Sequence, residues 1–111
     1  MNVYDTANRL AYEIKNSEEY INYKKVKEEI KGNPELKEKL EKFEKERYEV
    51  QIEAISKGSQ DTEKAADMQK LYAELISNDM MKKYFDAELK FNVMLADVNK
   101  IIGESVEDLI R

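Results

Sequence analysis

The sequence predicts an all-α protein: an antiparallel helical bundle of about five helices, formed by residues 1–111 as a single domain. Three observations support this. The three glycines and one proline lie where the apolar periodicity is interrupted. Between those points, apolar residues recur at spacings of three and four, the period of a helix. Charged residues make up 39% of the chain, which leaves narrow apolar seams between solvated faces.

The longest predicted helix covers residues 79–102 and should measure about 36 Å. Its apolar residues lie on several sides, in three stripes: Met81, Phe85, Phe91, Leu95, Val98 and Ile102; Met80, Tyr84, Ala87, Met94 and Ile101; Leu89, Val93 and Ala96. A helix on the surface of one domain needs a single stripe. We therefore expect this helix to be central, covered partly by its own chain and partly by a second copy. Gly103 is expected to end it.

A second long helix is predicted over residues 34–57. Gly32 suits the left-handed position after the preceding helix, Asn33 suits the N-cap, and Pro34 suits the first turn. A heptad seam follows, made of Leu36, Leu40, Phe43, Arg47, Val50 and Ala54. Arg47 either pairs with a buried carboxylate or packs its stem and extends its charged end into solvent.

Shorter helices are predicted over residues 3–15, 18–31 and 62–77. Ser17 is the expected cap of the second, and Asp61 or Thr62 that of the fourth. Residues 77–79 are expected to separate the fourth helix from the long one, with a continuous helix as the alternative. Tyr20 and Tyr23 form either a ligand platform or the rim of a core with wet hydroxyls. Residues 104–110 form either a final helical turn or a frayed end.

The residues that most enzymes rely on are missing. There is no cysteine and no histidine, which excludes thiolate chemistry, zinc–thiolate sites and the commonest general base. No glycine-rich phosphate loop is present, and none of the 24 acidic residues stands out as a catalytic pair. We therefore predict no catalytic, cofactor or metal residue and expect a protein that is not an enzyme.

Charge and hydropathy also limit the partners. The formal net charge is −5, and the basic residues between 24 and 47 alternate with acidic ones, which favours a solvated face over a phosphate-binding patch. The N-terminus is polar and lacks the apolar core of a signal peptide, and no apolar run approaches the length of a membrane span. We expect no direct nucleic-acid binding, no membrane insertion and a cytoplasmic location.

The apolar helix surface exceeds what a chain of this length is expected to cover. Such a surplus usually marks association, and a homodimer is the simplest form. The candidate interface residues are Phe43, Val50, Phe85, Phe91 and Leu95. The alternative is that all five belong to the core of a single chain.

Two stretches resemble a known family. Residues 4–43 contain Leu10-Ala11, Ser17-Glu18-Glu19-Tyr20, Tyr23-Lys24 and Asn33-Pro34-Glu35-Leu36, and the second stretch contains Tyr84-Phe85-Asp86-Ala87-Glu88, Phe91 and Ile101-Ile102. Together they resemble the YlbF/YmcA-like proteins of Gram-positive bacteria, with the nearest similarity to the short YheA-like branch. These motifs are signatures of helix packing and are not catalytic.

The resemblance implies a cytoplasmic, all-helical, self-associating protein. Better-known members are accessory factors of competence, sporulation and biofilm control, acting through a phosphorelay or on a membrane-associated ribonuclease. Some carry cysteines tied to an iron–sulfur cluster, which this chain lacks, so the cluster does not transfer. The leading hypothesis is a non-enzymatic regulatory adaptor whose partners are a second copy and another regulatory protein. The alternative is a self-assembling structural or chaperone-like protein without a dedicated partner.

Overall fold

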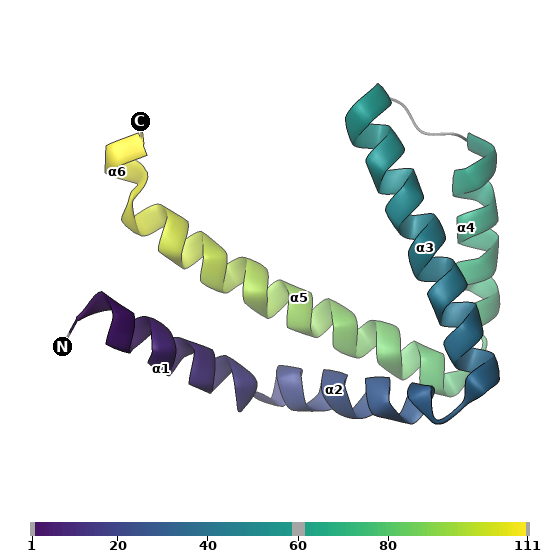
Figure 1. Cartoon of the computed structure of the whole chain (residues 1–111), viewed down its shortest axis with the longest axis horizontal. Helices are drawn as coiled ribbons and strands as arrows, with labels where there is room; N and C mark the ends of the chain where they lie inside the picture. Colours follow the sequence, from purple (N-terminus) through teal and green to yellow (C-terminus); the bar gives the residue numbers. More distant parts are fainter. Residues whose placement is uncertain (1, 59–61, 111) are drawn as a thin grey trace. The chain divides into compact units, whose positions relative to one another are not determined.

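The computed structural model describes residues 2–58 and 62–110, in which all regular secondary structure is helical. The helices are α1 (Val3–Lys15), α2 (Glu18–Lys31), α3 (Pro34–Lys57), α4 (Thr62–Leu75), α5 (Asp79–Ser105) and the single turn α6 (Glu107–Ile110) (Figure 1). The predicted all-α class and antiparallel packing are confirmed. The tail of the chain ends in a final helical turn, the first of the two possibilities predicted for it.

The chain divides into two compact units. Unit 1 comprises Met1–Val26 and Tyr84–Arg111, and so contains α1, the first part of α2, most of α5, and α6. Unit 2 comprises Lys27–Lys83, and so contains the end of α2, α3, α4 and the start of α5. The single domain expected from the sequence stays a prediction, and each unit is described by itself.

Unit 2 is built on the seam of α3. Leu36, Leu40, Phe43 and Val50 are all buried, as the heptad spacing predicts, and α3 packs against α4 as an antiparallel hairpin (Figure 1). The rings of Phe43 and Tyr72 lie 5.7 Å apart between their centroids. The guanidinium of Arg47 lies 5.4 Å from the centroid of the Phe43 ring, so Arg47 contributes a cation–π contact to the seam.

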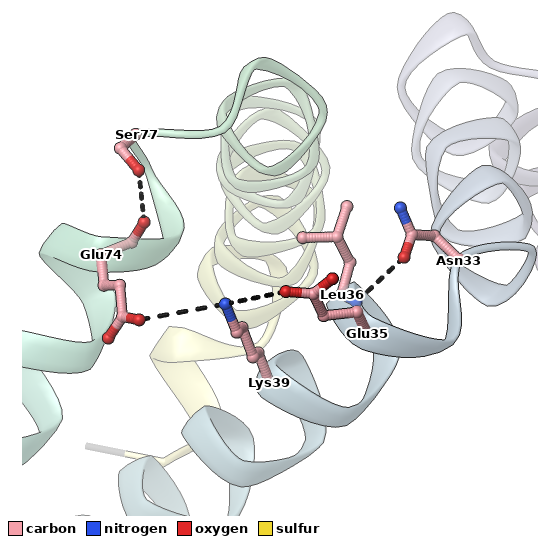
Figure 2. A network of polar contacts seen from close by, with 6 residues as sticks. All are labelled: Asn33, Glu35, Leu36, Lys39, Glu74 and Ser77. Atoms are coloured by element: carbon pink, nitrogen blue, oxygen red, sulfur yellow. Dashed lines mark hydrogen bonds and ion pairs between the residues drawn. The ribbon is translucent and has the colours of Figure 1, made fainter.

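Ion pairs join the two helices of the hairpin near its base. Lys39 Nζ lies 3.4 Å from Glu35 on its own helix and 3.9 Å from Glu74 on α4 (Figure 2). Ser77 Oγ donates to the backbone oxygen of Glu74 at 2.7 Å, which closes the last turn of α4. These contacts fix which end of α4 lies beside the start of α3.

The opposite end of the hairpin has its own ion pairs. Lys64 Nζ on α4 lies 3.3 Å from Glu53 and 3.7 Å from Glu49 on α3. Residue 39 thus pairs with 74, and 53 with 64, which is the register of an antiparallel pair. Exposed ion pairs add little energy individually, so their main effect here is to define that register while the buried seam supplies the stability.

Side-chain caps set the helix starts. Asn33 Oδ1 accepts from the Leu36 backbone N–H at 3.2 Å, ahead of Pro34 in the first turn of α3 (Figure 2). Asn78 Oδ1 accepts from the N–H groups of Met80 and Met81 at 2.9 and 3.2 Å, so α4 and α5 are separate and a continuous helix through Ser77 is wrong. Ser17 Oγ accepts from Tyr20 N–H at 3.2 Å, as predicted. Asp61 and the side chain of Thr62 lie outside the described residues.

Two expectations about glycine are wrong. Gly103 does not end α5, which continues to Ser105, because glycine permits the left-handed turn that often ends a helix but does not require it, and Gly103 does not adopt it. Gly32 follows the end of α2 without that conformation: its N–H is shared between the carbonyls of Glu28 and Glu29, which tightens the last turn instead. Among the described residues only Gly58, the C-cap of α3, has a positive φ, at 71°.

Replacing Gly58 and Gly103 by alanine should have opposite effects on stability. An added Cβ meets no atom within 4 Å at either position, so backbone conformation alone decides. Gly58→Ala should lower the free energy of unfolding by about 1 kcal/mol, because an L-residue is strained at positive φ. Gly103→Ala should raise it by roughly 0.5 kcal/mol, because alanine loses less entropy in a helix. Urea unfolding followed by circular dichroism measures both, and two changes of the same sign would contradict this reading.

Candidate functional site

An aromatic cluster in unit 1 joins α2 to α5. The ring of Tyr23 lies 5.5 Å from that of Phe91 and 5.6 Å from that of Tyr84, measured between centroids. Tyr20 also contacts Phe91, at 6.2 Å, and Phe85 meets Tyr84 edge-on at 5.4 Å. Tilted and edge-on geometries at these distances are the favourable ones for aromatic pairs. The cluster therefore holds the first part of α2 antiparallel to α5.

A carboxylate completes the cluster. The hydroxyls of Tyr23 and Tyr84 lie 3.4 Å apart, and both donate to Oε2 of Glu88, at 3.3 and 3.5 Å. Tyr84 is only 1% exposed, so its hydroxyl needs such a partner. Of the two interpretations of Tyr23 given by the sequence, the packed ring fits the rim of a core, but the hydroxyl is not left to water, because it donates to Glu88. Among residues 2–58 and 62–110, no three acidic side chains converge on a metal site.

Beyond this cluster, unit 1 exposes much of its apolar surface. Eleven of the fifteen exposed large hydrophobic residues of the described chain belong to it. They are Val3, Tyr4 and Tyr12 of α1, Ile21 of α2, Leu89, Val93, Ile101 and Ile102 of α5, then Val106, Leu109 and Ile110. None of the residues of α1 is buried. These side chains lie on the helices of a charged chain, where contiguous apolar surface usually marks a contact with another protein.

Unit 2 differs from unit 1 in that most of the buried hydrophobic residues lie in it and few of the exposed ones do. Seven of the nine buried hydrophobic residues of the described chain belong to it, namely Ile30, Leu36, Leu40, Phe43, Val50, Leu75 and Met81. Its exposed large hydrophobic residues are Tyr48, Ile52, Ile55 and Tyr72. Unit 2 thus has a core of its own, and the surface that needs cover is concentrated on unit 1.

The structure separates the five candidate interface residues into two groups. Phe43 and Val50, in unit 2, are each only 4% exposed and offer almost no surface to a partner. Phe85, Phe91 and Leu95 lie on α5 in unit 1 and are partly exposed. The more exposed residues of α1 and α5 were not among the predicted interface residues, although the predicted stripes of the long helix include Leu89 and Val93. The spacing of those stripes was the available signal, but spacing does not reveal exposure.

Within the described residues, no helix combines the length and the apolar character needed to cross a membrane. The exposed apolar side chains are interrupted by charged ones, as at Lys90 and Asp86, which form an ion pair at 3.0 Å on α5. A mixed surface of this kind suits contact with a protein, whose own charged residues can pair with it.

Comparison with known proteins identifies a family that matches nearly the whole chain. Residues 3–107 match the family described as "Control of competence regulator ComK, YlbF/YmcA". A UPF0342 protein of Symbiobacterium thermophilum is 34% identical over 105 residues, which cover 95% of this chain and 94% of that protein. A UPF0342 protein of Halothermothrix orenii is 37% identical over 108 residues, with 96% and 91% covered.

A solved structure shares the fold. It is a chain from the crystal structure of Bacillus subtilis RicA in complex with RicF, with a TM-score of 0.62 and 23% sequence identity. The similarity covers 98% of this chain and 96% of that one, so the two chains share a fold over nearly their whole length.

Removing one hydroxyl from the aromatic cluster should measure its contribution. Tyr23→Phe removes a hydroxyl that donates to Glu88 and leaves the ring contacts in place. We expect a loss of about 1 kcal/mol in the free energy of unfolding, measured in urea. Tyr48→Phe is the matched control, because that side chain is 64% exposed, and it should change stability by less than about 0.5 kcal/mol. Equal effects of the two substitutions would contradict a structural role for the hydroxyl of Tyr23.

Proposed function

The chain belongs to the YlbF/YmcA family, described by its control of the competence regulator ComK, and from this premise we propose that it is a non-enzymatic regulatory adaptor. It acts by binding other proteins through exposed faces of its helices. The observation that carries the proposal is the concentration of exposed apolar side chains on unit 1, beside a unit 2 with its own core. No catalytic constellation in the sequence competes with this function.

The proposed contact surface centres on α5. Leu89 and Val93 are 62% and 50% exposed and lie one helical turn apart, so they point to the same side. Ile101, 69% exposed, extends the apolar surface toward the end of the helix. Covering such side chains contributes about 25 cal/mol per Å² of apolar area, which favours association over continued exposure.

The proposed partners are of two kinds. The first is a second copy of this chain, giving a homodimer. The second is another helical regulatory protein, a class supported by the RicA–RicF complex whose fold this chain shares. Phe85, Phe91 and Leu95 remain in the proposed interface, whereas Phe43 and Val50 support the α3–α4 hairpin from inside.

Two finer assignments belong to the same proposal. We place the chain with the short YheA-like branch, supported by its lack of the cysteines that some relatives carry. We also place it in the cytoplasm, supported by its family of intracellular-process regulators and by a composition without cysteine. Control of competence is the process in which its binding function is expected to act.

Sedimentation of the purified chain tests the proposal. We expect a dimer at micromolar concentration, and Leu89→Glu with Val93→Glu should weaken it by about 100-fold, because two apolar contacts become buried charges. Ile52→Glu with Ile55→Glu is the matched control, since these two exposed isoleucines of unit 2 lie outside the surface, and it should leave the dimer intact.

The same pair of variants tests binding to a partner. The chain is titrated against the other YlbF/YmcA proteins encoded in its own genome, with calorimetry as the readout. At least one should bind, and the α5 variant should lose that binding while the control retains it. A single-copy protein at hundreds of micromolar that binds none of them would overturn the proposal. Assemblies that keep growing with concentration would instead favour the self-assembling structural alternative.

A further inference from the structure

The joint between α1 and α2 carries an open hollow of about 540 Å³ that the proposed function does not use. Its shape is set by local hydrogen bonds. Asn16, one of its lining residues, donates from Nδ2 to the backbone oxygen of Tyr12 at 2.7 Å. Ser17 Oγ donates to the carbonyl of Ile14 at 2.6 Å and accepts from Tyr20 N–H. Both sides of the joint are therefore held by contacts that lie wholly within unit 1.

The hollow is basic and apolar. Lys15, Lys24 and Lys25 line it together with Tyr12, Tyr20 and Ile21, and no acidic residue lines it. None of the three lysines forms an ion pair with any residue in the described part of the chain. Tyr12 and Ile21 are 69% and 51% exposed. A matching occupant presents apolar side chains flanked by carboxylates, because it must cover the rings and neutralise the lysines.

The C-terminal segment of this chain has that chemistry. Within residues 104–110, Leu109 and Ile110 are 82% and 78% exposed, and Val106 lies one turn before them. Glu104, Glu107 and Asp108 supply three carboxylates in the same seven residues. In Figure 1 the segment forms the last turn of α5 and the turn α6, well away from the α1–α2 joint of its own chain, although both belong to unit 1. Residues 104–110 therefore cannot reach the hollow of their own chain, but they can reach the hollow of a second copy.

We infer that residues 104–110 of one copy occupy the hollow lined by Lys15, Lys24 and Lys25 in a second copy. The inference rests on the self-association proposed above and adds a second contact to the α5 surface. Each copy has one segment and one hollow, so a reciprocal exchange satisfies both and closes the assembly as a two-fold dimer. The exchange covers Leu109 and Ile110 with the rings of Tyr12 and Tyr20 and brings three carboxylates to three lysines.

A charge exchange tests the inference. The hollow variant is Lys24→Glu with Lys25→Glu, the segment variant is Glu107→Lys with Asp108→Lys, and the third protein combines them. All four positions are exposed, so the helical circular dichroism should not change. The dimer dissociation constant of each is measured by sedimentation equilibrium at low salt. Lys82→Glu with Lys83→Glu, two exposed lysines of unit 2, matches the charge change of the hollow variant.

We expect the hollow variant and the segment variant each to weaken the dimer by about tenfold or more, and the combined protein to return to within about threefold of the parent. The segment variant moves the net charge from −5 toward zero, which by itself favours association, so weakening there reports a specific contact. The control should change the constant by less than about threefold.

Three results would overturn the inference. The first is a combined protein that does not recover, and the second is a hollow variant that behaves like the control. The third is a dimer weakened by the hollow variant alone, which would mean that another segment fills the hollow. In each case a dimer that Leu89→Glu with Val93→Glu still disrupts leaves the proposed function standing. A parent chain that stays monomeric would overturn both this inference and the self-association proposed above.

Discussion

The burial of the α3 seam is the interaction on which the rest of the structure depends. Leu36, Leu40, Phe43 and Val50 pack α3 into the hairpin with α4, and unit 2 thereby takes most of the buried apolar residues of a heavily charged chain. Few buried apolar residues are left to form a core in unit 1. There, the aromatic contacts of Tyr23 with Tyr84 and Phe91 join α2 to α5. The apolar faces of α1 and α5 are thus exposed because most of the buried apolar side chains lie in unit 2.

The helix boundaries could largely be predicted because capping is local chemistry. Asn33, Pro34 and Ser17 act where the sequence places them, since a cap depends on residues within one turn. Gly103 and Gly32 are the exceptions, because the helix end predicted at Gly103 and the left-handed conformation predicted at Gly32 are both wrong. A glycine permits a left-handed backbone but does not require one, and neither residue adopts it. The hydrogen bonds around a glycine decide whether it adopts that conformation. These bonds depend on neighbouring residues that the spacing of apolar residues in the sequence does not reveal.

Which apolar residues stay exposed on the chain could be predicted only in part, for a different reason. A heptad seam predicts that a helix is covered along one side, but it does not say by which helix. For Phe43 and Val50 the cover comes from their own chain, whereas Phe85, Phe91 and Leu95 keep some exposed surface. The exposed residues of α1 were not predicted as interface residues because their periodicity is that of an ordinary amphipathic helix, whose apolar face is expected to be covered by its own chain. Whether such a face is covered depends on tertiary packing and therefore appears only in three dimensions.

The uneven cores of the two units bear on regulation. A region with few buried contacts opens more readily than one with a packed core, so unit 1 should be the less stable part of the chain. A partner that binds its exposed faces adds the missing cover and stabilises the folded form, by about 2.7 kcal/mol when its concentration is a hundred times the dissociation constant. Folding of unit 1 and binding are then coupled, and the level of the partner sets how much of the chain is fully ordered. For the adaptor function proposed above, this coupling lets the chain respond to its partner through its own stability, without a catalytic residue.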